Sequence, residues 1–347
     1  MLYVTTRSKH DVYTPAITMQ QNRGPDGGLF VPFKMPEFDR SAINALADKT
    51  FGQNVADILN LFFGTKLTGW DVDMAIGRNP FKIRSMNFRI LIGELYHNME
   101  ANFDRMIRVL SERVHPDGDI IGKHSDWLDI AVRIGVLFGI FGELIATEQI
   151  RSDKPINIAV SSGNFASPMA AWYARQMGLP IGTIICGCNQ NGAPWDLLHR
   201  GELDTDAIAV NTSTPKCDYA LPPDLERLIC AACNQDETLN YCFHCTEGGT
   251  YRPDRDAHAA IRQGMFAAVV SGVRVQTIIP SVYHTNRYIL DQYSALAYGA
   301  LADYRSRTGK STMTLLLVEN SPVTQGESIA KAMNITVPEL KKRLAEG

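Results

Sequence analysis

The 347-residue sequence lacks the features that mark several special classes of protein. Its 34 Lys and Arg nearly balance its 37 Asp and Glu, so a net charge of −3 provides no basic surface for nucleic acid or an anionic membrane. The first residues contain no apolar stretch typical of a secretory signal. The longest apolar run, 134–146, is too short to span a bilayer. These absences favour a cytoplasmic protein that binds neither nucleic acid nor membrane.

The rest of the composition is that of an ordinary globular protein. Apolar residues make up 45% and charged residues 20% of the chain, which is long enough for one large or two modest domains. The seven cysteines are an odd number in a long chain, which is typical of reduced thiols in the cytosol.

Strand and helix signals alternate in the second half of the chain. Short β-branched apolar runs predict buried strands at 29–31, 156–160, 181–186, 207–210 and 312–318. Helical spacing of apolar residues predicts helices at 41–46, 51–63, 98–114, 126–147, 168–177, 193–200, 225–232 and 290–304. This alternation predicts an α/β fold with a parallel sheet covered by helices on both faces. In such sheets, ligands bind beyond the carboxyl ends of the strands.

One loop, SSGNFAS at 161–167, has features of a ligand site, because it follows a predicted strand and precedes a helix. Its small residues let the backbone approach a ligand closely, and the helix amino terminus favours a phosphate. We expect Ser167 to cap the helix and Pro168 to occupy its first position. The loop is neither a Walker A nor a GxGxxG motif, and a plain strand–helix turn would have a similar composition.

The longer stretch IAVSSGNFASPMAAWYARQMGLP (158–180) resembles the threonine synthase segment that carries a GNFG phosphate loop. Other short segments resemble motifs of that family in the same order. They are YVTTR (3–7), DGGLFVP (26–32), ELYH (94–97), SDW (125–127), CNQN (188–191), TPKCDY (214–219) and LERL (225–228). Many matches in order are more specific than any one of them.

The resemblance implies a fold-type II pyridoxal-phosphate enzyme fold, similar to the tryptophan synthase β-chain. Threonine synthases convert O-phosphohomoserine and water into threonine and phosphate. The cofactor-binding residues implied by the resemblance are Ser162, Gly163, Asn164, Phe165, Ala166 and Asn189. Asn191 would line the same cleft.

The sequence departs from the family at the residue that the chemistry requires. Where the family has a lysine that forms a Schiff base with the cofactor, ten residues after the start of ELYH, this chain has Asp104, and a carboxylate cannot form an imine. The family's threonine that faces the pyridine nitrogen is replaced by Glu319, which could pair with a protonated ring nitrogen.

The small domain of the family is also largely deleted. Only residues 106–124 separate the two flanking motifs, whereas one βαβ unit alone needs about 30 residues. We therefore predict a threonine-synthase-type N-terminal region at 1–97, a remnant of the small domain at 98–124 and a large α/β domain at 125–347.

Two functions remain open. The first is a degenerate homologue, with no catalytic residue, that binds a phosphorylated ligand or pyridoxal phosphate non-covalently. The second is an active lyase that uses a relocated lysine or a partner chain. Lys82 and Lys123 are candidates for that lysine, although a surface position is the more ordinary expectation for both. The lost domain also suggests a homo-oligomer that covers exposed apolar surface.

Four cysteines, Cys230, Cys233, Cys242 and Cys245, have the spacing C-x2-C-x8-C-x2-C of a zinc site. The alternative is that each CxxC pair places two small apolar side chains on one face of a helix as free thiols.

Overall fold

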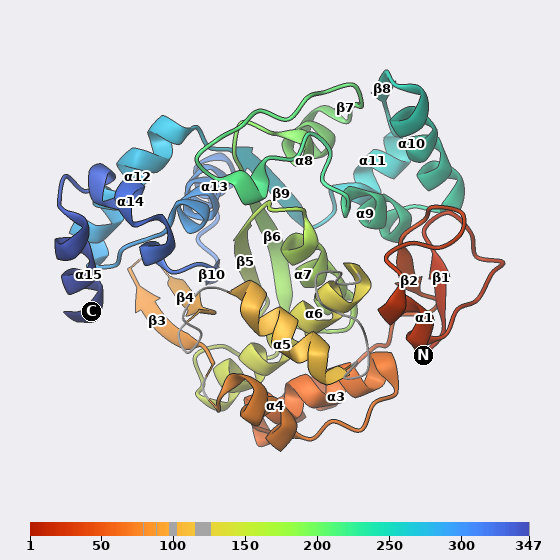
Figure 1. Cartoon of the computed structure of the whole chain (residues 1–347), viewed down its shortest axis with the longest axis horizontal. Helices are drawn as coiled ribbons and strands as arrows, with labels where there is room; N and C mark the ends of the chain where they lie inside the picture. The colour runs from red at the N-terminus through yellow and green to blue at the C-terminus, as the bar shows by residue number, and fades with distance from the viewer. Residues whose placement is uncertain (79, 88, 97–102, 115–125, 347) are drawn as a thin grey trace.

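The protein is built around one six-stranded sheet, which lies at the centre of the molecule in Figure 1. The computed structural model describes every residue except 79, 88, 97–102, 115–125 and 347, and it does not describe the side chains of 103–106 and 126. In order across the sheet, the strands are β3 (Lys82–Met86), β4 (Ile90–Glu94), β10 (Thr314–Val318), β5 (Ile156–Ser161), β6 (Ile181–Cys188) and β9 (Met265–Val269). The strands from β4 to β9 are parallel, which confirms the predicted parallel sheet.

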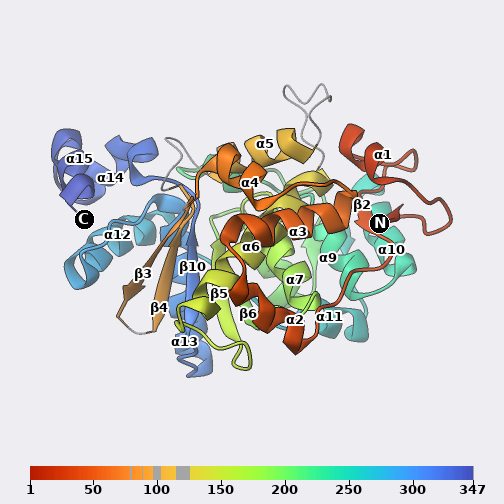
Figure 2. The same cartoon turned by 90° about the horizontal axis from the view of Figure 1, so that it is seen from below.

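Helices cover both faces of this sheet because successive side chains of a strand point to opposite sides. Ile158 and Val160 of β5 belong to a core that includes α3 (Phe51–Phe63), α6 (Asp126–Ala146) and α7 (Ala166–Gln176). Ala159, between them, belongs to a second core with α12 (Gly272–Asn286), α13 (Gln292–Thr308) and α14 (Gly326–Ala332). The view from below in Figure 2 shows these two helical layers on either side of the strands.

The N-terminal region packs on the first of these cores. It contains β1 (Tyr3–Thr5), α1 (Pro15–Gln20), β2 (Phe30–Pro32), α2 (Arg40–Asn44), α3, α4 (Gly69–Ile76) and, further along, α5 (Phe103–Val114). Helix α3 begins with a capping box formed by Thr50 and Gln53. The Tyr3 ring meets the buried Trp127 ring of α6 edge to face, with the centroids 5.8 Å apart.

A buried polar cluster fastens the N-terminus to α9 (Leu225–Ala232). The carboxylate of Glu226 accepts hydrogen bonds from the hydroxyl of Thr6 and the guanidinium of Arg7. The fully buried Arg227 donates from Nε to the carbonyl oxygen of Phe30 at 3.1 Å and pairs with Asp224. The hydrogen bonds of Arg7 with Glu226 and of Arg227 with Phe30 thus join segments about 200 residues apart along the chain.

The remaining elements are mostly short segments between β6 and β9, together with the last helix of the chain. They are α8 (Ala193–Trp195), a π-turn (Asp196–Arg200), β7 (Leu203–Asp204), a 3-10 turn (Pro215–Cys217), α10 (Gln235–Glu247), β8 (Thr250–Tyr251), α11 (Arg255–Ile261) and α15 (Val337–Glu346). Two further 3-10 turns span Ala45–Asp48 and Pro322–Gln325. Within the described part of the chain, no helix has the length and apolar character needed to cross a bilayer.

Most predicted elements agree with the structure, but one strand does not. Residues 207–210 form no strand and lie in a loop, where the side chain of Ile208 is 88% exposed. The helix predicted at 98–114 begins at Phe103, and residues 98–102 lie outside the described part. The structure also contains strands that the sequence pattern had not indicated, namely β1, β3, β4, β7, β8 and β9.

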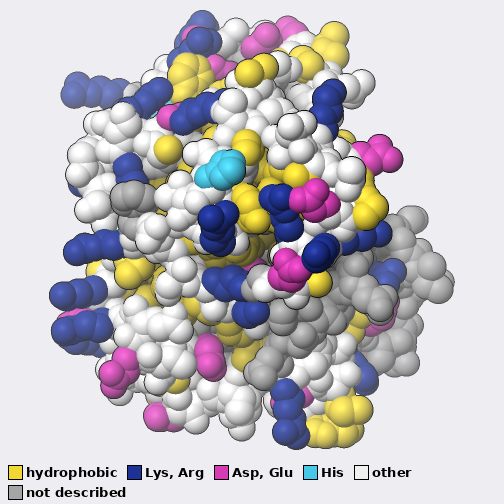
Figure 3. Space-filling model, turned by 90° about the vertical axis from the view of Figure 1, so that its left-hand side faces the viewer, with side chains coloured by type: hydrophobic (Ala, Val, Ile, Leu, Met, Phe, Trp, Pro, Cys, Tyr) yellow, Lys and Arg dark blue, Asp and Glu magenta, His cyan; other side chains and the backbone are white. Residues whose placement is uncertain are grey.

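Strand β3 is an exposed edge of the sheet and pairs antiparallel with β4. It carries two basic residues, Lys82 and Arg84, and charged side chains on an edge strand discourage pairing with another chain. Figure 3 views the molecule from the side on which α12, α14, α15 and β3 lie, and Lys and Arg side chains are frequent around an apolar hollow there.

Candidate functional site

The candidate site lies where the carboxyl ends of the parallel strands meet. Ser162–Ala166 follow β5, Asn189 follows β6, and Glu319 and Asn320 follow β10. The loop at 211–218 lies beside these ends, since Gly163 N donates to Cys217 Sγ at 3.3 Å. The amino terminus of α13 adjoins the same loop, since Lys216 N donates to the Tyr293 hydroxyl at 3.4 Å. Ligands of parallel sheets bind at this edge, as expected from the sequence.

The turn at 162–166 has an unusual backbone. Gly163 has φ +49° and Phe165, whose side chain is buried, has φ +75°. A left-handed conformation is uncommon for a bulky residue and is concentrated at ligand sites, where the surrounding structure holds it. Phe165 N donates to Ser162 O at 2.7 Å, and Ala166 N donates to the side-chain oxygen of Asn164 at 3.1 Å.

The expected helix start was wrong by two residues. Phe165 is the N-cap of α7 and Ala166 is its first residue, so Ser167 does not cap the helix and Pro168 is not at its first position. The left-handed Phe165 redirects the chain into the helix earlier than the Ser-Pro pair suggested. The hydroxyl of Ser167 instead contacts the side chains of Arg133 and Glu319.

Ser162 places a buried hydroxyl in this turn. Its side chain is 2% exposed, and its Oγ has no well-formed hydrogen bond within the described part of the chain. The thiol of Cys217 is close enough to interact with it, but sulfur is a weak hydrogen-bonding group. A buried hydroxyl without a strong partner costs free energy unless a ligand completes its hydrogen bond, so this atom is a candidate phosphate contact.

The thiol of Cys217 forms a hydrogen bond with one backbone N–H group of the turn. Its sulfur accepts a hydrogen bond from Gly163 N at 3.3 Å. Burial raises the pKa of this thiol to about 11, so it stays protonated at neutral pH. Sulfur is a weak acceptor, and a phosphate oxygen would therefore compete well for the same N–H.

Lys216, next to Cys217, brings a primary amine to this edge of the sheet. Its Nζ donates to the side-chain oxygen of Asn320 at 2.8 Å and lies 5.9 Å from the centroid of the Tyr293 ring. Its carbonyl oxygen would lie 3.9 Å from a Cβ added to Gly163. Sequence reasoning missed this residue, although it lies in the 214–219 segment that resembles the family.

Asn189 and Asn191 hold the loop that carries Lys216. The amide nitrogen of Asn189 contacts Asp218 at 2.7 Å and Thr212 at 2.8 Å. Asn191 Nδ2 donates to Val210 O at 2.9 Å. Asn189 also lines a small hollow of about 180 Å³ together with Thr214 and Leu296. That Asn189 binds a cofactor remains a prediction, while its observed contacts position the loop.

Glu319 belongs to a partly buried ion-pair cluster. Its Oε1 lies 3.2 Å from an Arg133 guanidinium nitrogen, and Arg133, which is 9% exposed, also contacts Asp129 at 3.2 Å. Two carboxylates thus share the charge of one arginine. The guanidinium therefore competes with any ligand nitrogen for Glu319, and Arg133 had not been singled out from the sequence.

Asp291 forms the N-cap of α13 beside Tyr293. It is fully buried and accepts hydrogen bonds from Tyr293 N at 2.8 Å and Ser294 N at 3.3 Å. Burial raises the pKa of Asp291 to about 6, since the hydrogen bonds offset only part of the desolvation cost. Burial also raises the pKa of the Tyr293 hydroxyl to about 12, so that it remains a neutral donor and acceptor.

Some of the residues that bear on whether a lysine could bind the cofactor covalently lie outside the described part of the chain. The backbone of Asp104 lies in α5, but its side chain, His97 and Lys123 lie outside the described residues. Lys82 pairs with Glu94 at the start of β3, which is at the carboxyl edge of the sheet. It is three strands from β5, or roughly 14 Å at the usual strand spacing, whereas Lys216 lies beside the turn.

The four cysteines with zinc-like spacing do not form a metal site in the described part of the chain. No group of three or more His, Cys, Asp or Glu side chains that could hold a metal ion occurs there. All four are free thiols, and Cys233 Sγ contacts Ala257 O at 3.7 Å. Burial raises the pKa of Cys233 to about 11 and that of Cys242 to about 12.

Comparison with known sequences finds proteins that are similar to this chain. Residues 2–78 match the family model described as the threonine synthase N terminus. The chain is 29% identical over 215 residues to threonine synthase-like 1 from Pongo abelii, a match that covers 57% of this chain and only 29% of that protein. It is 24% identical over 279 residues to threonine synthase from Pseudomonas aeruginosa, covering 76% of this chain and 57% of that one.

Comparison with solved structures shows the fold. Pyridoxal-phosphate-bound threonine synthase from Brucella melitensis superposes with a TM-score of 0.84 at 18% sequence identity, covering 96% of this chain and 92% of that chain. Threonine synthase from yeast superposes with a TM-score of 0.81 at 17% identity, covering 96% and 90%. The expected fold-type II architecture is therefore confirmed.

Proposed function

Since the chain has the N-terminal domain and the fold of the threonine synthases, we propose that it is a threonine synthase-like protein that binds a phosphorylated ligand at the turn 162–166. The ligand that we propose is pyridoxal phosphate. It is bound non-covalently, because Asp104 cannot form a covalent bond with its aldehyde. The observation that carries this proposal is the buried hydroxyl of Ser162, which lacks a strong partner in a turn built from left-handed residues.

The residues of the turn fit a phosphate group. Ser162 supplies a hydroxyl, and Gly163 supplies an N–H that is held only by the weakly accepting Cys217 sulfur at 3.3 Å. The amino terminus of α7 adds its dipole, which favours an anion. A phosphate oxygen accepts stronger hydrogen bonds than a thiol does, so ligand binding would displace the contact between Gly163 and Cys217.

The other residues at this edge would position the body of the ligand. Asn189 holds the loop at 211–218 against β6, and Asp291 anchors the start of α13, which carries Tyr293. Pyridoxal phosphate, when bound, supplies an electron sink for a carbon next to an amine. Asp104 supplies no amine for that chemistry, and this absence supports a binding role rather than catalysis.

A test follows from the state of Ser162. Ser162→Ala removes a hydroxyl that has no strong hydrogen bond in the ligand-free protein, so we expect the free energy of unfolding to stay the same or to rise. Binding of pyridoxal phosphate, followed by its visible absorbance, should weaken about tenfold or more, because a hydrogen bond to a charged group is lost.

The matched control is Ser111→Ala in α5. Ser111 is as fully buried as Ser162, but its hydroxyl donates to Ile107 O at 2.8 Å. This variant should lose stability and keep its ligand affinity. Equal affinity in the wild type and Ser162→Ala would reject the proposed site.

Lys216 favours a second candidate, an active lyase with a relocated lysine. Its amine hydrogen-bonds to Asn320 at 2.8 Å, at the end of β10 and beside the turn. In this alternative, the ε-amine of Lys216 would hold the ligand's aldehyde through a carbon–nitrogen double bond, with loss of water. Lys216 would then supply the amine that chemistry on O-phosphohomoserine requires.

Borohydride reduction separates the two candidates. The protein is incubated with pyridoxal phosphate, reduced and digested, and modified lysines are located by mass spectrometry. Absorbance that dialysis removes, with no modified lysine, supports non-covalent binding. A tag on Lys216 that Lys216→Arg abolishes and Lys82→Arg does not, together with phosphate release from O-phosphohomoserine, supports the lyase.

A further inference from the structure

Two adjoining hollows lie at the amino ends of the strands, on the side of the sheet opposite the turn at 162–166. Their volumes are about 460 Å³ and 580 Å³, and they share Arg89 and Ser311. The walls include Ile90 at the start of β4, Ile156 at the start of β5, and Met313 just before β10. At five residues, β10 separates this edge from the other by roughly 16 Å, so the two regions do not overlap.

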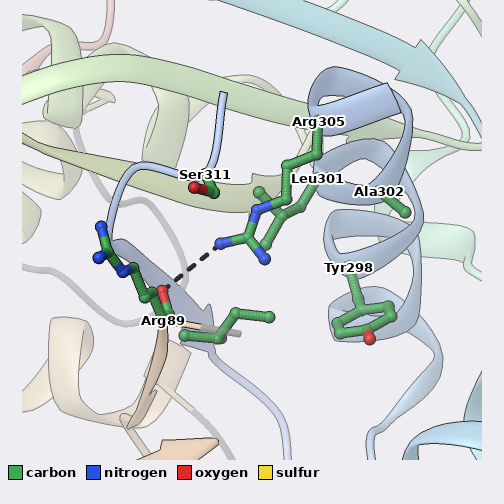
Figure 4. A pocket seen from close by; sticks show the side chains of 7 residues that line it. Arg89, Tyr298, Leu301, Ala302, Arg305 and Ser311 are labelled. Carbon is green, nitrogen blue, oxygen red and sulfur yellow. Dashed lines mark hydrogen bonds between the residues drawn. The ribbon is translucent and has the colours of Figure 1, made fainter. Parts of the chain in front are cut away.

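Arg305 of α13 reaches into the first hollow. Figure 4 shows its guanidinium between the helix and the backbone of Arg89, with Ser311 above it. Its hydrogen bonds go to the carbonyl oxygens of Thr312 at 3.4 Å and Arg89 at 3.5 Å, which are long for such bonds. Its Nε is buried and has no partner in the described part of the chain.

The charge of Arg305 is also not balanced. Within the described part of the chain, no ion pair involves Arg305, Arg89, Lys154 or Lys310, which all line the two hollows. A further basic residue of the second hollow, Arg151, pairs with Asp153. Glu148 is the one acidic residue among those that line the two hollows. Burial lowers the pKa of Arg305, as expected for a partly desolvated cation without a carboxylate beside it.

The first hollow also has an apolar floor. Ile90 and Leu301 are buried, and Ala302 and the ring of Tyr298 extend the lining along α13. Figure 4 shows the Tyr298 ring on the same helix as Arg305. A concave apolar surface beside several unpaired cations suits a molecule with both an anionic group and a flat apolar body.

We propose that this basic hollow is a second binding site, for a small organic phosphate such as a nucleoside diphosphate. The phosphates contact Arg305, Arg89 and Lys310, and the apolar ring lies over Tyr298 and Leu301. Arginine is suited to this task because its planar donors match phosphate oxygens. The site is separate from the proposed ligand turn and does not depend on it.

A purely structural role for Arg305 gives a different expectation. In that case it would only tie α13 to the segments before β4 and β10, and the unpaired basic residues around it would be ordinary solvated side chains. Phosphate compounds would then bind weakly and without regard to Arg305.

Calorimetric titration of the whole chain with ADP, inorganic pyrophosphate and adenosine tests the proposal. We expect ADP to bind most tightly, pyrophosphate less tightly and adenosine least, because each simpler probe lacks one part of the recognition. Arg305→Gln should weaken ADP binding about tenfold or more. Lys310→Gln, at an exposed residue, should weaken it by a smaller factor without affecting folding.

Arg307→Gln is the matched control, since Arg307 lies on the same helix but over the Phe266 ring, 5.9 Å from its centroid. It should leave the ADP affinity unchanged. No ADP binding at millimolar concentration, or an affinity that is the same in wild type, Arg305→Gln and Lys310→Gln, would overturn the second site. Binding sensitive to Ser162→Ala instead would assign ADP to the turn and reject this site.

Discussion

Replacing Asp291 by Asn should make the protein more stable at neutral pH. The carboxyl group of Asp291 is fully buried, and its pKa rises from 3.8 to about 6 in the folded protein. Because the raised pKa means that the folded state favours the protonated form, this group supports folding at low pH. That support is lost as the pH rises through about 6.

The size of the effect follows from the two pKa values. A difference of about two pKa units corresponds to about 3 kcal/mol, since one unit is about 1.4 kcal/mol. An asparagine is isosteric with the neutral acid and is equally good as an N-cap, so it can accept the hydrogen bonds from Tyr293 N and Ser294 N. Asp291→Asn should therefore add up to about 3 kcal/mol to the free energy of unfolding above pH 7, and almost nothing near pH 4.

Urea unfolding monitored by tryptophan fluorescence at several pH values between 4 and 8 measures this difference. Asp254→Asn is the matched control, because Asp254 is an exposed N-cap that accepts from Ala257 N at 2.8 Å in α11. It reports the effect of the same substitution on the surface. A stability difference for Asp291→Asn that does not change with pH, or a loss of stability at pH 7.5, would refute the reasoning.

Three other predictions concern packing, a buried charge and thiol exposure. Gly187→Ala should lower the free energy of unfolding by about 2 kcal/mol or more, because its methyl group would collide with the Leu296 backbone, whereas Gly272→Ala, which meets no atom, should leave the urea midpoint unchanged. Arg227→Ala should cost about 3–5 kcal/mol in the same assay, because the buried carboxylate of Asp224 would lose the positive charge of Arg227, and a loss below about 1 kcal/mol would contradict this. Iodoacetamide should label the exposed Cys245 first and the buried Cys186 only after unfolding, as peptide mass spectrometry can show, and early labelling of Cys186 would contradict the packing.

The sequence predicted the elements whose signal is local. The helix at 225–232 and the strand at 156–160 have strong periodicity or a continuous β-branched run, and both agree with α9 and β5. The strand at 207–210 failed because a short apolar run becomes a strand only if another strand pairs with it. No strand among the described residues pairs with that segment, and its backbone instead donates from Val210 N to the side chain of Asn191 at 2.7 Å.

The sequence singled out the turn after β5 as a candidate site, but it did not indicate the residues that the fold brings beside that turn. The turn after β5 could be recognised from its small residues and its resemblance to a known family. The left-handed Phe165 could not, because propensity assigns such a conformation to glycine or asparagine. Lys216 was missed because only the fold brings a loop about 50 residues further along the chain onto the turn.

The hydrogen bonds between the N-terminal region and α9 have a consequence for attempts to divide the protein into fragments. Cutting the chain near residue 78, where the family match ends, would separate Arg7 from Glu226 and Phe30 from Arg227, and would strip Tyr3 from Trp127. Each fragment would expose to solvent charged side chains that have lost their ion-pair partners and aromatic rings that are buried in the whole protein. The two stretches thus form one cooperative unit, and shortened versions of this protein should aggregate rather than behave as separate modules.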